Sequence, residues 1–214
     1  MNYSELIAAS QAYADRNDLE VRESMETFIL MAEARINRVL KTRKQSTSTY
    51  TPTVDDQEFY SLPPDYAGMR DIQLNSDLPD GPHKSASFTM LTPELFNIQR
   101  NKPSTGKNFY SIIGNQIQIF PVQKAGQTIQ IVYYQKVQAL SNVKNANDDF
   151  TENWLSIDHP DIYLAGITAE ISLFAKDYDT ADGWSARMSL AIEELDNTDV
   201  VERWSGTPLT MRVG

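Results

Sequence analysis

Three pairs of adjacent acids and two histidines are the side chains whose types and spacing suit acid–base chemistry. The acid pairs are Asp55-Asp56, Asp148-Asp149 and Glu193-Glu194. General acid–base catalysis needs two groups that face one site, whereas neighbouring side chains on a helix diverge and usually lie on a solvated surface. Asp158 and His159 resemble a carboxylate–imidazole couple, but Pro160 follows directly and favours the start of a helix there. We therefore expect no catalytic residue and no enzyme.

Cofactor and metal chemistry lacks most of the residues that it uses. The sequence contains no cysteine, and its two histidines, His83 and His159, are too few for a multi-histidine metal site. Its nine glycines form no phosphate-binding loop. No apolar run approaches the length of about 18 residues that a membrane span requires. We expect no metal, no cofactor and no membrane partner.

A basic stretch that contains no acid is the first candidate binding feature. Its cations are Arg35, Arg38, Lys41, Arg43 and Lys44. One interpretation is that they lie at a helix C-terminus, where each cation stabilises the helix dipole by about 0.3–1 kcal/mol. The other interpretation is a docking face for an acidic partner or for nucleic-acid phosphates. Both stay open, and we mark Arg35, Arg38 and Lys41 as candidate contacts to a partner protein.

The formal charge of −10 is concentrated in the last third of the chain. Residues 1–144 carry equal numbers of acids and bases, whereas residues 145–214 carry fourteen acids and four bases. Nucleic-acid-binding proteins usually show a basic footprint, and an acidic surface repels phosphate. The charge therefore argues against a dedicated DNA-binding protein.

Periodicity divides the chain into helical, β and helical stretches, which predicts an α+β fold. We expect a helical bundle built from residues 1–44 and 142–197, with a small antiparallel β domain, residues 45–141, inserted between them. Helical spacing of apolar residues marks the stretches from Val21 to Val39 and from Ala181 to Leu195. In the β region, Gly114-Asn115 lies between two apolar runs and predicts a two-residue hairpin.

The last stretch, residues 198–214, is apolar but has no helix or strand period, so we expect an extended tail. Its candidate partner-binding residues are Val200, Val201, Trp204, Leu209 and Met211. Disordered tails are usually poor in such residues. The segment therefore either folds back over its own domain or waits for the groove or sheet edge of a partner, and the sequence favours neither.

Several strings in order along the chain carry a resemblance to a known family. They are FILMAEARINRVLKTR, YSLPPDYAGMRDIQLN, LTPELF, FYSIIGNQIQIFP, TIQIVYYQKVQALS and NWLSIDHPDIYLAGITAEISLFAKD. Together they resemble tailed-phage head-to-tail adaptor (connector) proteins, most closely those of short-tailed phages. The resemblance runs from about residue 2 to residue 196 and leaves the C-terminal tail unmatched.

The resemblance implies a structural virion protein that is assembled in the host cytoplasm and located in the neck or tail. Such adaptors form a dodecameric ring under the portal protein, extend the DNA channel and offer a docking surface to tail nozzle or fibre proteins. In the family, the C-terminal segment often reaches the portal. Genomic DNA is then expected to pass through the ring without specific binding.

Two other classes of function remain as alternatives. The first is a hydrolase directed at cell-wall sugars, which would need two carboxyl groups roughly 5–9.5 Å apart across a cleft. The second is a monomeric binding module whose β region holds a small ligand. The mass in solution separates them from an adaptor, because only the adaptor is expected to assemble into a ring, at least with a portal.

Overall fold

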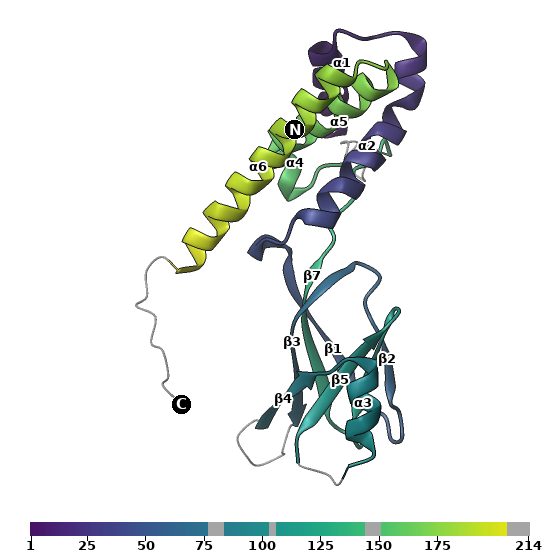
Figure 1. The fold of residues 1–214 in the computed structure, drawn as a ribbon, viewed down its shortest axis with the longest axis vertical. Coiled ribbons are helices and arrows are strands. Elements are labelled where there is room, and N and C mark those ends of the chain that lie inside the picture. The colour runs from purple at the N-terminus through teal and green to yellow at the C-terminus, as the bar shows by residue number, and fades with distance from the viewer. Residues whose placement is uncertain (77–83, 103–105, 144–150, 205–214) are drawn as a thin grey trace. The chain divides into compact units, whose positions relative to one another are not determined.

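The computed structural model describes residues 1–76, 84–102, 106–143 and 151–204, and the chain divides into two compact units (Figure 1). The first unit joins the two ends of the chain, Met1–Arg43 and Val137–Gly214. The second unit is the continuous stretch Lys44–Lys136. Each unit has its own cluster of buried apolar side chains, so each builds its own core.

Helices build the described part of the first unit: α1 (Tyr3–Ala14), α2 (Leu19–Val39), α4 (Trp154–Asp158), α5 (Pro160–Phe174) and α6 (Tyr178–Trp204). Side-chain caps define where the first two begin. The Asn2 side chain accepts a hydrogen bond from the Glu5 N–H at 3.0 Å, and Glu5 accepts one from the Asn2 N–H at 2.9 Å. Asp18 accepts from the Val21 N–H at 3.0 Å.

Helix α5 is the centre of the first unit and contacts α1, α2, α4 and α6 (Figure 1). The apolar stripe of α2 faces it, and Ala32 and Ile36 are fully buried. Gly166 of α5 allows the helices to approach closely, because a Cβ there would lie 3.1 Å from the Ala32 Cβ and 3.2 Å from the Met188 Sδ. The absence of a side chain at this position therefore lets α2, α5 and α6 pack closely together.

A sheet of seven strands builds the described part of the second unit, together with the 3₁₀ turn η1 (Arg43–Gln45), which begins one residue before it, and helix α3 (Pro93–Arg100). The strands are β1 (Ser46–Pro52), β2 (Phe59–Ser61), β3 (Tyr66–Ser76), β4 (Lys84–Met90), β5 (Asn108–Ile113), β6 (Gln116–Phe120) and β7 (Thr128–Gln135). Their order is β1-β7-β3-β4-β5-β6-β2, and Figure 1 shows the sheet strongly curled. All neighbours are antiparallel except β4 and β5, which run parallel.

Alternating side chains place the core on one face of the sheet. In β7, Ile129, Ile131 and Tyr133 are buried, while the residues between them are half exposed. The predicted hairpin joins β5 to β6, and Gly114 supplies the positive φ of +59° that its turn needs. Helix α3 packs on the sheet through Phe96, whose ring meets Phe120 edge-on at 6.3 Å.

The predicted fold class is wrong, although the protein does mix helices and strands. The chain is not a helical bundle with a small antiparallel insertion, because its β region is a curled, mixed seven-stranded sheet. The parallel pair arises because α3 carries the chain from β4 to β5, and a parallel connection needs such a crossover. The extended tail is also wrong over residues 198–204, which continue α6. Residues 205–214 lie outside the described residues.

Candidate interaction surfaces

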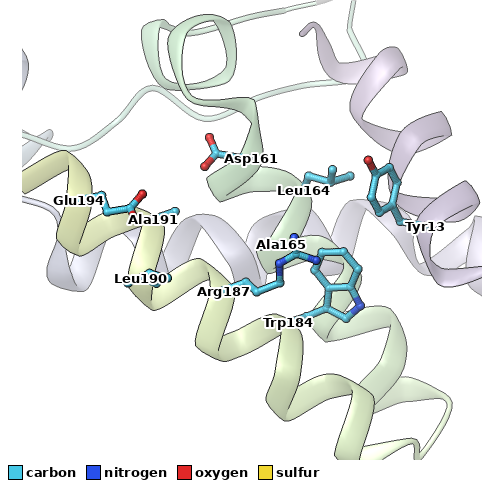
Figure 2. Close-up of a pocket in the computed structure, with 9 residues that line it drawn as sticks. All are labelled: Tyr13, Asp161, Leu164, Ala165, Trp184, Arg187, Leu190, Ala191 and Glu194. Carbon is cyan, nitrogen blue, oxygen red and sulfur yellow. The ribbon is translucent and has the colours of Figure 1, made fainter.

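A groove of about 280 Å³ runs between α1, α5 and α6 in the first unit (Figure 2). It is lined by Tyr13, Asp161, Leu164, Ala165, Trp184, Arg187, Leu190, Ala191 and Glu194. Tyr13 and Leu190 are 59% and 55% exposed, although both are large and largely apolar. Exposed apolar patches often mark interaction sites, and a hydrophobic groove is the form that binds an amphipathic helix.

One end of the groove is aromatic and the other is acidic. The Tyr13 and Trp184 rings meet edge-on with centroids 5.7 Å apart, and the Arg187 guanidinium carbon lies 4.9 Å from the Trp184 ring centroid. Figure 2 places Asp161 and Glu194 toward the other end. The arrangement can hold an apolar anchor beside the indole and a cationic side chain near the carboxylates.

A second concave surface, of about 340 Å³, lies along α2 and next to residues 139–140. Three carboxylates line it, those of Glu23, Glu26 and Glu33. Glu33 is 6% exposed, and burial raises the pKa of its carboxyl above the ordinary value, although hydrogen bonds from the Leu140 N–H and the Tyr163 hydroxyl counteract the rise.

Glu33 belongs to a buried polar network that ties the returning chain to the helices. Its Oε1 accepts from the Leu140 N–H at 2.7 Å and from the Tyr163 hydroxyl at 3.3 Å. Asn153 donates to that hydroxyl at 2.8 Å and to the Gln138 carbonyl at 2.6 Å. Burial, and next the charge of Glu33, raise the pKa of Tyr163, so it stays a neutral donor. The network is structural, because its members satisfy one another.

The basic stretch divides into an internal part and an exposed part. The Arg35 Nη1 lies 3.4 Å from the Glu170 Oε1 and 3.4 Å from the Ser185 Oγ, so this guanidinium links α2 to α5 and α6. Burial lowers the pKa of Lys41, which is half-buried. Arg38 is exposed, and no ion pair of Arg38 is seen within the described ranges. That these residues contact a partner stays a prediction.

The last turns of α6 carry the first candidate tail residues. Val200 and Val201 are 50% and 67% exposed. Asp199 beside them is buried, and its two carboxylate oxygens each accept from the Arg43 N–H at 3.1 Å. The carboxylate therefore ties the end of α6 to the turn after α2. The side chain of Trp204 lies outside the described residues, as do Leu209 and Met211, so their role also stays a prediction.

Those candidate acids and histidines that the structure describes do not come together in one place. Asp55 accepts a hydrogen bond from the Ala125 N–H at 2.8 Å, and Glu193 and Glu194 are exposed on α6. His159 lies between α4 and α5, where Pro160 begins α5 as expected, and its side chain makes no capping hydrogen bond. Asp148, Asp149 and His83 lie outside the described residues.

Sequence reasoning missed the groove, Glu33 and Asp199. Glu33 had a signal, because it interrupts the apolar stripe between Ile29 and Ile36, where an acid needs buried partners. The groove had none, since its walls come from residues 13, 161–165 and 184–194, which only the packing of α1, α5 and α6 brings together.

The described residues contain neither a metal-binding cluster nor a membrane-spanning helix. Residues 1–76, 84–102, 106–143 and 151–204 contain no group of three or more His, Asp or Glu placed to hold a metal ion. Over the same ranges, every helix is too short or too polar to cross a membrane.

The described residues thus present two concave surfaces and exposed apolar residues near the end of α6. Comparison with known families identifies the class of protein. Residues 1–212 match the model of the SU10 adaptor protein family, and the chain belongs to that family. It is a phage adaptor, a structural component of the virion, which confirms the broad resemblance noted from the sequence. A search of curated proteins returned no match.

Proposed function

We propose that this adaptor forms a dodecameric ring under the portal protein of a short-tailed phage. The ring extends the DNA channel and offers tail nozzle or fibre proteins their docking surface. The observation that carries the proposal is the family match, which spans residues 1–212 and therefore both units. The ring, the portal protein and the tail partners in this proposal are those that the resemblance to head-to-tail adaptors implies.

The charge of the chain supports a conduit that DNA passes without binding. Each copy carries −10, so twelve copies would carry about −120. A channel with that net charge repels the phosphate backbone, whereas tight DNA binding depends on neutralising phosphates with Lys and Arg.

The exposed apolar residues of the first unit support contacts between proteins. Tyr13 and Leu190 flank the groove, and Val200 and Val201 lie at the end of α6. Each would be covered on assembly with a neighbouring copy or with the portal. Buried aromatic side chains usually dominate such interfaces, and truncating one costs about 2 kcal/mol or more.

Light scattering with and without the portal protein tests assembly. The free chain is expected to be a monomer or small oligomer, and the portal-bound sample to reach the mass of a ring on a portal. Identical masses in the two samples would refute the ring. Electron-microscope class averages of the mixture then count the copies, and a count other than twelve would refute the dodecamer alone.

Arg38→Glu separates partner contact from internal packing better than Arg35→Glu does. Arg38 is exposed, so its reversal should leave the thermal unfolding of the free chain unchanged and weaken ring assembly, more strongly at low salt. Arg35 holds Glu170, so its reversal disturbs the fold itself. Arg38→Gln is the matched control and should show a smaller loss. Unaltered assembly of Arg38→Glu at low salt would remove Arg38 from the interface.

A further inference from the structure

Strand β1 forms one edge of the curled sheet. Among the described residues it pairs with β7 alone, in an unbroken register from Ser46 opposite Tyr134 to Pro52 opposite Thr128. The Thr53 N–H donates to the Gln127 carbonyl at 2.9 Å, which continues the same register. Backbone groups alternate in an antiparallel pair, so the odd-numbered residues of β1 face β7 and the even-numbered ones face outward.

The outward backbone groups of β1 form a row ready for a further strand. Ser46, Ser48 and Tyr50 each direct an N–H and a C=O away from β7, whereas Pro52 offers only its carbonyl. In the described part of the chain, no backbone hydrogen bond engages the outward groups of Ser48 and Tyr50.

Natural edge strands are usually protected by charges, bulges or shortness, and β1 has little of this. Its sequence, STSTYTP, contains no charged residue, and its register has no bulge. The opposite edge, β2, is only three residues long. Within the described residues, one edge strand is therefore short, whereas the other is seven residues long and has outward backbone groups at Ser48 and Tyr50 that an added strand could pair with.

The chain itself contains a segment with the pattern of that strand. Helix α6 ends at Trp204, so ten residues follow it. They begin with Ser-Gly-Thr-Pro and continue with Leu209-Thr210-Met211-Arg212-Val213. Apolar and polar residues alternate over those last five positions, as in a half-buried strand. The other segments outside the described residues, 77–83, 103–105 and 144–150, do not alternate in this way.

We propose that residues 209–213 of one copy add to the β1 edge of a neighbouring copy and link the subunits of the ring. The inference rests on the proposed assembly of copies and names the contact that joins them. The side chains of Thr49 and Thr51 share a face of the sheet with their cross-strand partners Ile131 and Ile129, which are buried.

The added strand would therefore extend the core of the second unit. Leu209, Met211 and Val213 would lie on the face of the odd-numbered β1 residues, beside this core. Thr210 and Arg212 would lie on the opposite face, beside Ser48 and Tyr50. This division between faces predicts which positions can be cross-linked.

Because the chain has no cysteine, single introduced cysteines report the contact without interference. Full-length Ser48→Cys and Thr210→Cys chains are mixed, assembled with the portal and oxidised. A disulfide in this mixture can form only between copies, and two strands side by side bring such residues within its reach. We expect a cross-linked pair with Ser48→Cys or, in a shifted register, with Tyr50→Cys. The matched control, Thr47→Cys, lies on the other face and should stay at background.

Tyr50→Pro blocks the edge and keeps the fold. It removes an outward N–H and leaves the hydrogen bonds to β7 intact, whereas Tyr50→Thr keeps that N–H and loses the same side chain. Loss of assembly and of the cross-link is expected for Tyr50→Pro, and retention of both for Tyr50→Thr. Circular dichroism of the free variants verifies that each is folded.

The outcomes separate this inference from the proposed function. Ring assembly without a cross-link at position 48 or 50, and unaffected by Tyr50→Pro, would overturn the strand pairing and leave the ring in place. A cross-link of Thr210→Cys to the portal instead would also overturn it. An unchanged mass in the presence of the portal would refute the ring. If the cross-link were then also absent from a concentrated sample of the free chain, the strand pairing would be refuted too.

Discussion

Replacement of Glu33 tests whether the buried network holds the first unit together. Glu33→Ala removes the acceptor of two buried donors, the Leu140 N–H at 2.7 Å and the Tyr163 hydroxyl at 3.3 Å. A buried polar group left without a partner costs about 1–3 kcal/mol. Two such groups and a small cavity predict a loss of about 3 kcal/mol in the free energy of unfolding, a large share of the typical total of about 5–15 kcal/mol.

Glu33→Gln is the matched control, because its amide oxygen can still accept both hydrogen bonds while the buried charge is gone. Burial is the largest influence on this carboxyl and raises its pKa, so the charged form is the disfavoured one. At pH 7 we therefore expect Glu33→Gln to lie within about 1 kcal/mol of the natural chain.

The two forms should also differ in their dependence on pH. A carboxyl whose pKa is higher in the folded chain than its value of about 4.3 in an unfolded chain binds more protons when folded. Stability from this group is therefore greatest below about pH 4 and falls as the pH rises through the folded pKa. Gln does not titrate, so the free energy of unfolding of Glu33→Gln should not contain this decrease. The variant should therefore become more stable relative to the natural chain as the pH rises.

Urea unfolding followed by tryptophan fluorescence measures these differences. All three tryptophans, Trp154, Trp184 and Trp204, belong to the first unit, so the signal reports on the unit that contains Glu33. A cost below about 1 kcal/mol for Glu33→Ala, or equal costs for the Ala and Gln variants at pH 7, would refute the reasoning. So would an unchanged pH slope in Glu33→Gln.

Three further predictions address other contacts. Asp199→Ala should cost about 1–3 kcal/mol and expose the last turns of α6 to hydrogen exchange, because the buried carboxylate accepts from the Arg43 N–H; unchanged exchange there would contradict it. Gly114→Ala should cost about 1–2 kcal/mol in thermal unfolding, because φ is +59° there. A Cβ at this position would meet no atom within 4 Å, so backbone strain alone causes the loss. Gly114→Asn should cost less, and equal losses for the two variants would contradict this explanation. Arg35→Glu should destabilise the free chain by at least about 2 kcal/mol, because it places a like charge beside the buried Glu170, and a melting temperature equal to that of Arg38→Glu would show otherwise.

Features that depend on neighbours in the sequence were predictable. The spacing of six apolar residues predicted a one-faced helix, and five of them are buried along α2: Val21, Met25, Phe28, Ala32 and Ile36. The sixth, Val39, is exposed at the end of the helix, so the predicted stripe was one residue too long. Pro160 predicted the start of α5, and Gly114-Asn115 predicted the β5–β6 turn. These features depend on helix or turn geometry over a few residues, which the local sequence contains.

The sheet topology could not be predicted in this way. Strand β7 pairs with β1 and β3, and the paired residues are between 53 and 88 positions apart in the sequence. Several strands have a similar alternating pattern, so the pattern does not say which of them β7 pairs with. The parallel β4–β5 pair was missed for the same reason. Alternation indicates that a segment is a strand, but the partner and direction depend on how the whole sheet buries its apolar face.

The sequence by itself determined the class of the protein, the helical faces and the uneven charge, because composition, period and family motifs are properties of the chain. Tertiary structure alone decided which charged residues are internal and which strands form the edges of the described sheet. Arg35 and Arg38 are three positions apart in one basic stretch, yet only Arg35 meets Glu170. Helix α6 continues through residues 198–204, which were predicted to be an extended tail, and within this stretch the Asp199 carboxylate accepts from the Arg43 N–H, 156 residues away. Such contacts join distant segments, and their energy becomes available only when packing brings those segments together.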